Sequence, residues 1–159
     1  MPKSAPAART TLDFARPLAT VDVVILTLGL RGLQVLLVQR PDNADEPFPD
    51  AWALPGGFVD VARDADLQAC ALRKLHEKTA VRSPYLEQVG SWGGRARDPR
   101  GWSTTCVYVA LLPPSATSVG KGGNAADVRW FDVTQDGTVP SAGDLAFDHA
   151  RLLAAALQR

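Results

Sequence analysis

The feature that most constrains the fold is a pair of apolar segments close to the N-terminus. Residues 19–30, ATVDVVILTLGL, and residues 33–40, LQVLLVQR, are rich in β-branched and aliphatic side chains, and Arg31 and Gly32 separate them. Two short apolar runs that flank a two-residue turn containing glycine are typical of a β-hairpin. We therefore expect the domain to begin with two buried, paired strands.

The remainder of the chain combines further strands with two helical segments and shows no internal repeat. Periodicity and turn residues place strands at 85–92, 103–113 and 127–133, and helices at 64–79 and 144–159. Asp64 is the expected N-cap of the first helix, because an aspartate side chain can accept hydrogen bonds from free helical N–H groups. Strands accompanied by only two helices predict an α/β domain with a mixed sheet and helices packed on its faces.

Composition excludes several functional classes. The chain has 159 residues, and its 17 Lys and Arg balance 17 Asp and Glu, which opposes a dedicated nucleic-acid binder. No apolar run approaches the ~20 residues needed to cross a bilayer, and the N-terminus lacks the apolar core of a secretion signal. We expect residues 1–18 to form a flexible tail, residues 19–159 to form one domain, and the cytoplasm to be the compartment.

The cysteines and histidines are expected to be structural. Cys70 and Cys106 lie within helical and strand patterns, which favours reduced core residues over a disulfide or a metal pair. His149 has apolar neighbours on the last helix and is expected to pack or cap, whereas His76 is expected to point to solvent.

The first helix carries two columns of charge downstream of a glycine pair. Lys74 lies one turn before Lys78, and Arg73 lies one turn before Glu77, because residues four apart share a helix face. A solvated surface stripe would explain such a pattern. Like charges four residues apart nevertheless disfavour a helix, so an anionic ligand is the alternative explanation. Gly56-Gly57 allows close backbone approach, and the helix that follows could offer N–H groups to an anion.

The segment LPGGFVDVARDADLQACALRKLHEKTAV, residues 54–81, resembles a Nudix box, whose family pattern is G-x5-E-x7-R-E-U-x-E-E-x-G-U, with U a bulky apolar residue. Gly57, Arg73, Leu75, Glu77 and Val81 fall on matching positions. The resemblance implies an α/β/α sandwich around a mixed β-sheet. It also implies helix carboxylates that bind Mg²⁺, which activates water against a nucleoside diphosphate linked to another moiety.

The same segment departs from the family pattern at the metal site. Lys74 and Lys78 stand where the pattern has glutamates, so Glu77 is left from three carboxylates, and Ala80 replaces a glycine. The upstream glutamate is missing and the spacing before the helix is two residues longer than in the pattern. An ammonium about 4 Å from Mg²⁺ would repel it by roughly 2 kcal/mol in water and about 8 kcal/mol at an effective dielectric near 20. We expect the metal site to be lost, while the ammonium groups still bind a diphosphate.

A narrower resemblance involves the stretches LRKLHEKTAV, YLEQVG, RDPRGWS and LAFDHARLL, between residues 72 and 153. They are similar to the Nudix domain of the Nudix-related transcriptional regulators of NAD biosynthesis. That family senses ADP-ribose or related nucleotides and binds DNA through a separate C-terminal winged helix, which we do not expect within these 159 residues. The resemblance implies a homodimeric sensor with weak or no hydrolysis, no cofactor for binding, and no DNA binding by this chain alone.

Arg97 and Arg100 flank an Asp-Pro turn that Trp102 follows, which suits phosphate or ribose recognition or base stacking, although a solvated surface turn is the simpler alternative. The residues expected to bind the ligand are Arg40, Gly56, Gly57, Phe58, Arg73, Lys74, Lys78, Arg97, Arg100 and Trp102.

The first competing hypothesis is an active, Mg²⁺-dependent hydrolase of the ADP-ribose pyrophosphatase type. Its metal would be held by Glu77 with Asp64, Asp66 or Glu87. The second is direct DNA binding, which the zero net charge opposes.

Overall fold

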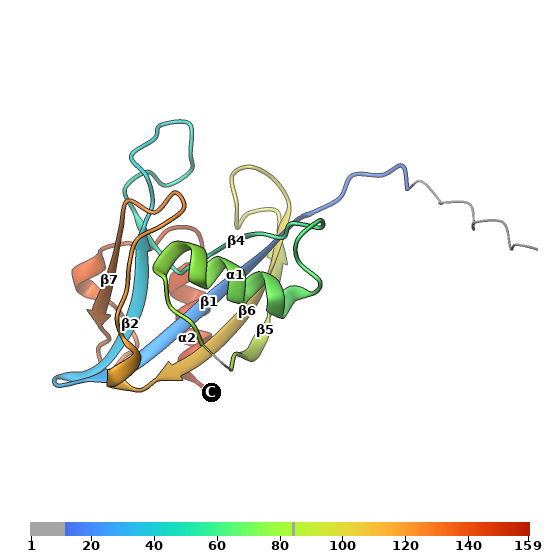
Figure 1. Ribbon diagram of the computed structural model, residues 1–159. Coiled ribbons are helices and arrows are strands. Elements are labelled where there is room, and N and C mark those ends of the chain that lie inside the picture. The colour runs from blue at the N-terminus through green and yellow to red at the C-terminus, as the bar shows by residue number, and fades with distance from the viewer. Residues whose placement is uncertain (1–11, 84) are drawn as a thin grey trace, which may run out of the picture.

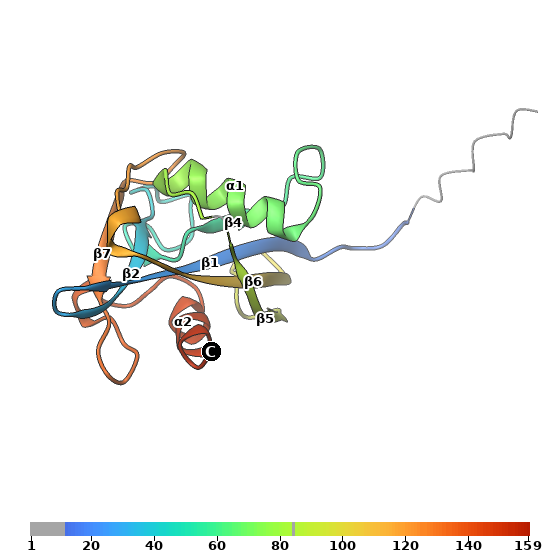
Figure 2. The same ribbon diagram turned by 60° about the horizontal axis from the view of Figure 1, so that its bottom comes forward.

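The computed structural model describes residues 12–83 and 85–159, and shows a mixed sheet with a helix on each face (Figure 1). The helix α1 (Leu67–Thr79) covers one face and α2 (His149–Leu157) covers the other, as Figure 2 shows edge-on. This arrangement confirms the mixed sheet with helices on its faces that the residue patterns predict, and the α/β/α sandwich that the Nudix resemblance implies. Most of the expected N-terminal tail lies outside the described residues. In the described part, no helix combines the length and apolarity needed to cross a bilayer.

The sheet contains seven strands, and its central strand has neighbours of both directions. Strand β1 pairs parallel with β6, and antiparallel with β2 and β4. Strand β5 extends the sheet beyond β6, while β3 and β7 both pair with β2. The bounds are β1 Leu18–Gly29, β2 Gly32–Gln39, β3 Trp52–Ala53, β4 Gly56–Phe58, β5 Glu87–Gly94, β6 Ser103–Leu112 and β7 Asp127–Asp132.

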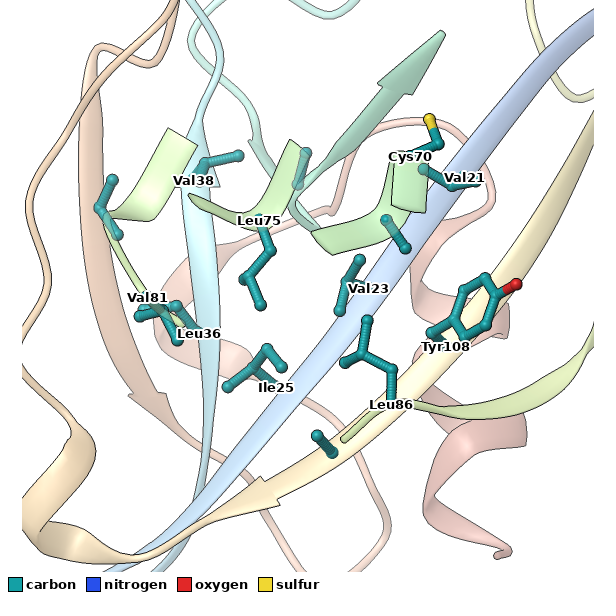
Figure 3. Close-up of a cluster of buried hydrophobic side chains, with 14 of the residues drawn as sticks. Val21, Val23, Ile25, Leu36, Val38, Cys70, Leu75, Val81, Leu86 and Tyr108 are labelled. Carbon is teal, nitrogen blue, oxygen red and sulfur yellow. The ribbon is translucent and has the colours of Figure 1, made fainter. Parts of the chain in front are cut away.

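Alternating residues of the central strands face two separate hydrophobic cores. On one face, Val23 and Ile25 of β1 pack with Leu75 of α1, and Figure 3 shows these side chains converging between the helix and the sheet. On the other face, Val24 joins the core that contains Leu152 of α2. The two-residue period of a strand therefore sends successive side chains of β1 to opposite helices. Both cysteines are unpaired and buried in the first core, as expected.

Strands β1 and β2 are paired only near their hairpin turn and then diverge. Their register runs from Gly29↔Gly32 to Leu26↔Val35. Beyond it, residues 20–22 of β1 pair with β4, and residues 38–39 of β2 pair with β3. The edge of β1 that does not pair with β6 is thus divided between β2 and β4. A space lined by polar side chains lies where the two strands have separated.

The start of each expected helix differs from the prediction, and the glycine pair has a role that was not predicted. The first helix begins at Leu67 with Asp66 as its N-cap, not at Asp64, because the Asp66 side chain accepts a hydrogen bond from the Ala69 N–H at 2.8 Å. The second helix begins at His149, because Phe147 has a left-handed backbone, with φ of 54°, that interrupts it. The glycine pair forms β4, where a side chain at Gly56 would collide with the Val21 carbonyl.

An ion-pair cluster fixes the start of α1 against the loop before it. The Arg73 guanidinium donates to both carboxylate oxygens of Asp64 at 2.6 Å, and to Glu77 at 3.1 Å. The Asp64 side chain is only 1% exposed, and the Asp60 N–H donates to it as well. The hydrogen bonds from Arg73 hold the pKa of Asp64 well below its usual range. Asp64 therefore anchors the helix from outside it.

We expect Leu75→Ala to lower the free energy of unfolding by about 2–5 kcal/mol, because it leaves a cavity where a fully buried side chain packs. Denaturant unfolding, followed by circular dichroism, measures the change. The exposed neighbour His76 provides the matched control, since His76→Ala should shift the free energy by less than about 0.5 kcal/mol. Equal losses in the two variants would contradict the packing described for α1.

Asp64→Asn should destabilise the protein by about 2 kcal/mol at pH 7, because Arg73 loses its charged acceptor. The folded-state pKa of Asp64 is depressed, so this stabilisation is present above the unfolded pKa and disappears as pH falls through the folded one. Urea unfolding from pH 6 down to pH 2 should therefore show the two proteins converging in stability. Asp42→Asn, in an exposed loop, is the control, and a gap that does not narrow in acid would refute the assignment.

Candidate functional site: a cationic cavity between the diverging strands

A cavity of about 380 Å³ occupies the space where β1 and β2 diverge. The strands, the helix α1 and several of the loops that connect the elements contribute to its wall. Its charged lining residues are Asp22, Arg40, Glu46, Lys74, Glu77, Lys78, Arg97, Asp98 and Arg100. The volume lies within the ~300–1,000 Å³ typical of small-molecule sites, and the many charges indicate a polar ligand.

Helix α1 contributes two ammonium groups to one wall. Lys74 and Lys78 both line the cavity, one helical turn apart, as their spacing predicts. Lys74 lies across the glycine pair, because a Cβ atom built on Gly57 would come within 3.2 Å of its Nζ. Within the part of the chain that the structure describes, neither lysine makes an ion pair or a side-chain hydrogen bond. Two positive charges therefore face the cavity without a protein anion attached to them.

The electrostatic surroundings of Lys78 oppose its charge. Burial, and then the positive charges of Lys74 and Arg40, lower the pKa of Lys78 to about 8. The pKa of Arg40 is also lowered, first by burial and then by the charge of Arg100. An anion that entered the cavity would relieve this repulsion, because an opposite charge favours the protonated form of a lysine.

Another part of the cavity wall is built from arginines stacked on aromatic rings. Arg100 lies over Phe58 at 4.8 Å and over Phe147 at 5.8 Å, measured to the ring centroids. Arg40 lies over Phe147 at 5.0 Å. Glu46 accepts from Arg40, and both carboxylate oxygens of Asp98 accept from Arg100. These pairs hold the two guanidinium planes in place beside the ligand space.

A buried polar network forms the floor of the cavity. The Leu54 N–H donates to His149 Nδ1 at 2.9 Å, which leaves Nε2 as the protonated nitrogen, 3.3 Å from Asp22. Asp22 also accepts from Thr105 at 2.7 Å. Arg97 donates twice to Asp148, at the start of α2, and lies 3.8 Å from Asp22. The prediction that His149 packs in the interior is confirmed. From α2, this residue contacts Asp22 of β1 and the Leu54 N–H.

The carboxylates available here do not fit the Mg²⁺ site of the family pattern. Glu77, the one remaining carboxylate of that pattern, is bound by Arg63 and Arg73 at 3.1 Å each, and two ammonium groups flank it on the same helix. Mg²⁺ requires several oxygen ligands in octahedral geometry. Within residues 12–83 and 85–159, no group of three or more His, Cys, Asp or Glu side chains could hold a metal ion.

The other carboxylates considered for a metal are engaged elsewhere. Asp64 binds Arg73, and Asp66 caps α1. Glu87 is the first residue of β5 and lies 3.7 Å from Arg159. None of the three lines the cavity. The N-terminus of α1 does not line it either, so the expected helix N–H site for an anion is wrong; the second half of the helix faces the cavity instead.

The cavity brings together most of the residues expected to bind a ligand and adds several that were not expected. Arg73 and Trp102 are outside the lining, because Arg73 turns to Asp64 and Trp102 packs beside Gly93. The lining includes Arg40, Gly56, Gly57, Phe58, Lys74, Lys78, Arg97 and Arg100. The additional polar and aromatic residues include Asp22, Glu46, Asp98, Asn124, Phe147 and His149. The available sequence signal is Asp22, the single charged residue of β1.

Comparison with known proteins agrees with this geometry. The chain matches the NUDIX domain family over residues 17–155. It is 46% identical, over 92% of its length, to the ADPR responsive transcriptional repressor NtrR of Acinetobacter baylyi, of which it covers 56%. The chain thus spans about half the length of that relative.

Two solved structures have similar folds. The NUDIX domain of Shewanella oneidensis NrtR, complexed with ADP ribose, has a TM-score of 0.78 and 42% identity, over 92% of this chain and 90% of that one. A MutT/nudix family protein from Enterococcus faecalis has a TM-score of 0.82 and 29% identity, over 95% and 64% of the two chains. The helix-flanked mixed sheet and the match across nearly the whole chain show that this protein belongs to the NUDIX domain family.

Proposed function

We propose that this domain binds ADP-ribose or a related nucleoside diphosphate derivative as a sensor, with weak or no hydrolysis. The observation that carries the proposal is the pair of ammonium groups, Lys74 and Lys78, which face a cavity without a protein anion. A diphosphate would supply the anionic partner that the two ammonium groups lack. Its oxygens can accept hydrogen bonds from both lysines.

The relatives support the same ligand class. The name of the Acinetobacter baylyi protein describes a repressor that responds to ADPR, and the Shewanella oneidensis domain was solved with ADP ribose. At 46% and 42% identity, these proteins are closer in sequence to this chain than the ADP-ribose pyrophosphatase of Methanocaldococcus jannaschii, which is 27% identical. The similarity therefore favours a sensor over a hydrolase.

Binding without a metal is part of the proposal. A lysine ammonium neutralises phosphate oxygens, but it does not convert a bound water into hydroxide as a metal ion does. Glu77 is held by two arginines, so it is poorly placed either to ligate Mg²⁺ or to accept a proton from water. The site can thus retain affinity for the diphosphate while it lacks the groups for its cleavage.

The wider biological role follows the regulators that the chain resembles. We propose a homodimer in the cytoplasm that reports on NAD metabolism. The DNA binding of a Shewanella oneidensis NrtR, which was solved with a 27mer DNA, belongs to a protein of which this chain covers 61%. Light scattering coupled to gel filtration tests the dimer directly.

We expect isothermal titration with ADP-ribose to give a saturable heat that returns to baseline, both with Mg²⁺ and with EDTA. Lys74→Gln and Lys78→Gln should each weaken binding about tenfold or more, because a charge-assisted hydrogen bond contributes roughly 1.5–3 kcal/mol. Lys121→Gln, an exposed lysine outside the cavity lining, is the matched control and should bind like the wild type.

Two outcomes would count against this proposal. Unchanged affinity in both Lys74→Gln and Lys78→Gln would show that these lysines do not bind the diphosphate. Sustained heat with accumulation of AMP and ribose 5-phosphate, abolished by Glu77→Gln, would establish the hydrolase alternative instead.

Binding should also depend on pH in the range where Lys78 titrates. Because its pKa is lowered to about 8, Lys78 loses its charge as pH rises through that value, and affinity should fall between pH 7 and pH 9.5. The bound anion should raise this pKa, so that complex formation near pH 8 takes up protons. Titrations in two buffers of different ionisation enthalpy measure the uptake. Lys78→Gln should abolish it, and a wild type that takes up no protons would contradict the assignment.

A further inference from the structure

A second cavity, of about 480 Å³, adjoins the first. Arg97, Asp98 and Phe147 line both, so the two spaces share one wall. The rest of the second cavity is formed by the loop between β5 and β6, by one residue of the loop between β2 and β3, and by the residue that precedes α2. These further lining residues are Phe48, Arg95, Ala96, Pro99, Gly101 and Asp148.

The aromatic wall of this second cavity has an unusual backbone. Phe48 and Phe147 both have positive φ, 55° and 54°, and their rings pack at a centroid distance of 4.7 Å. A bulky residue in the left-handed region is strained, and such strain persists where the surroundings hold it, often at a functional site. Phe147 is covered by Arg40 and Arg100, whereas Phe48 is 38% exposed and lines the cavity.

A continuous path of cationic and aromatic groups joins the lysines to Phe48. Arg40 is close enough to Lys78 to oppose its charge, and Arg40 stacks on Phe147, which in turn packs on Phe48. Arg95 lies beyond this pair, and it makes no ion pair or side-chain hydrogen bond with the residues that the structure describes. A ligand whose diphosphate lies at the lysines can therefore extend past the shared wall into the second cavity.

We propose that the second cavity binds the nucleobase of the ligand, with the Phe48 ring as its stacking platform. The proposal rests on the proposed function, because the diphosphate at Lys74 and Lys78 sets the position of the attached nucleoside. A nucleobase presents a flat π-face that stacks on an aromatic ring whatever its identity. The terminal sugar is then directed toward the floor of the first cavity, at Asp22 and His149.

The test compares a ligand with a base and a ligand without one. Phe48→Ala should weaken ADP-ribose binding about tenfold or more, since base stacking contributes roughly this factor per base. Pyrophosphate, measured by its displacement of ADP-ribose, should bind the variant as it binds the wild type. Phe48→Asn is the second variant, because asparagine tolerates the left-handed backbone without supplying a ring. Phe48→Trp should retain or improve the affinity for ADP-ribose.

Tyr85→Ala removes another exposed aromatic side chain, which lines neither cavity, and should leave both affinities unchanged. Wild-type affinity for ADP-ribose in Phe48→Ala and Phe48→Asn would overturn the base subsite. An equal loss for pyrophosphate would also overturn it, because the ring would then act on the diphosphate site. A wild type that binds neither ligand would instead refute the proposed function. If Lys78→Gln loses binding while the Phe48 variants bind normally, the proposed function holds and the base subsite is refuted.

Discussion

The site depends on the separation of strands β1 and β2. They pair only near their turn, because the first half of β1 is occupied by β4 on that edge and by β6 on the other. Strand β4 can approach β1 closely only with glycine at position 56, where any side chain would meet the Val21 carbonyl. The divided edge opens the cavity, and it allows Asp22, the single charged residue of β1, to reach that space.

Helix α1 connects the packing of the sheet with the binding site, because one of its faces is buried in the core and another lines the cavity. Leu75 packs into the core beneath it, and Arg73 binds Asp64 outside the cavity. The remaining face presents Lys74 and Lys78 to the ligand space. The core and the ion pair fix the rotation of the helix. The mutual repulsion of the lysines is the local cost of concentrating positive charge at one place.

Exchange of carboxylate for ammonium on such a helix changes what the same fold can do. Three carboxylates would attract a divalent cation, whereas two lysines and Arg40 attract the anion itself. Burial makes this preference sharper, because desolvated charges interact more strongly than exposed ones. The proposed sensor thus needs no new architecture. It needs substitutions at two positions of one helix face, held by the packing of Leu75 and the pairing of Arg73.

Local sequence was sufficient for much of this. Two apolar runs, 19–30 and 33–40, around a turn with glycine predict the hairpin, and the spacing of Lys74 and Lys78 predicts their shared face. Both signals arise between near neighbours. Most of the expected ligand residues, including Arg40, Phe58 and Arg100, do line one cavity. The sequence predicts Asp64 as the N-cap of α1, whereas the N-cap is Asp66. Both aspartates precede the helix, and only the fold shows that Asp64 forms an ion pair with Arg73.

Only the tertiary structure decided the remaining features. Phe147, His149 and Asp22 lie far apart in the chain, so no local pattern shows that the sheet brings them to one space. The left-handed backbone of Phe48 and Phe147 likewise arises from packing, against the intrinsic preference of the residue. The sequence by itself determined the elements and the sign of the charge on α1, because periodicity and charge are properties of adjacent residues. Tertiary packing alone decided which of these charges meet, because long-range contacts place them.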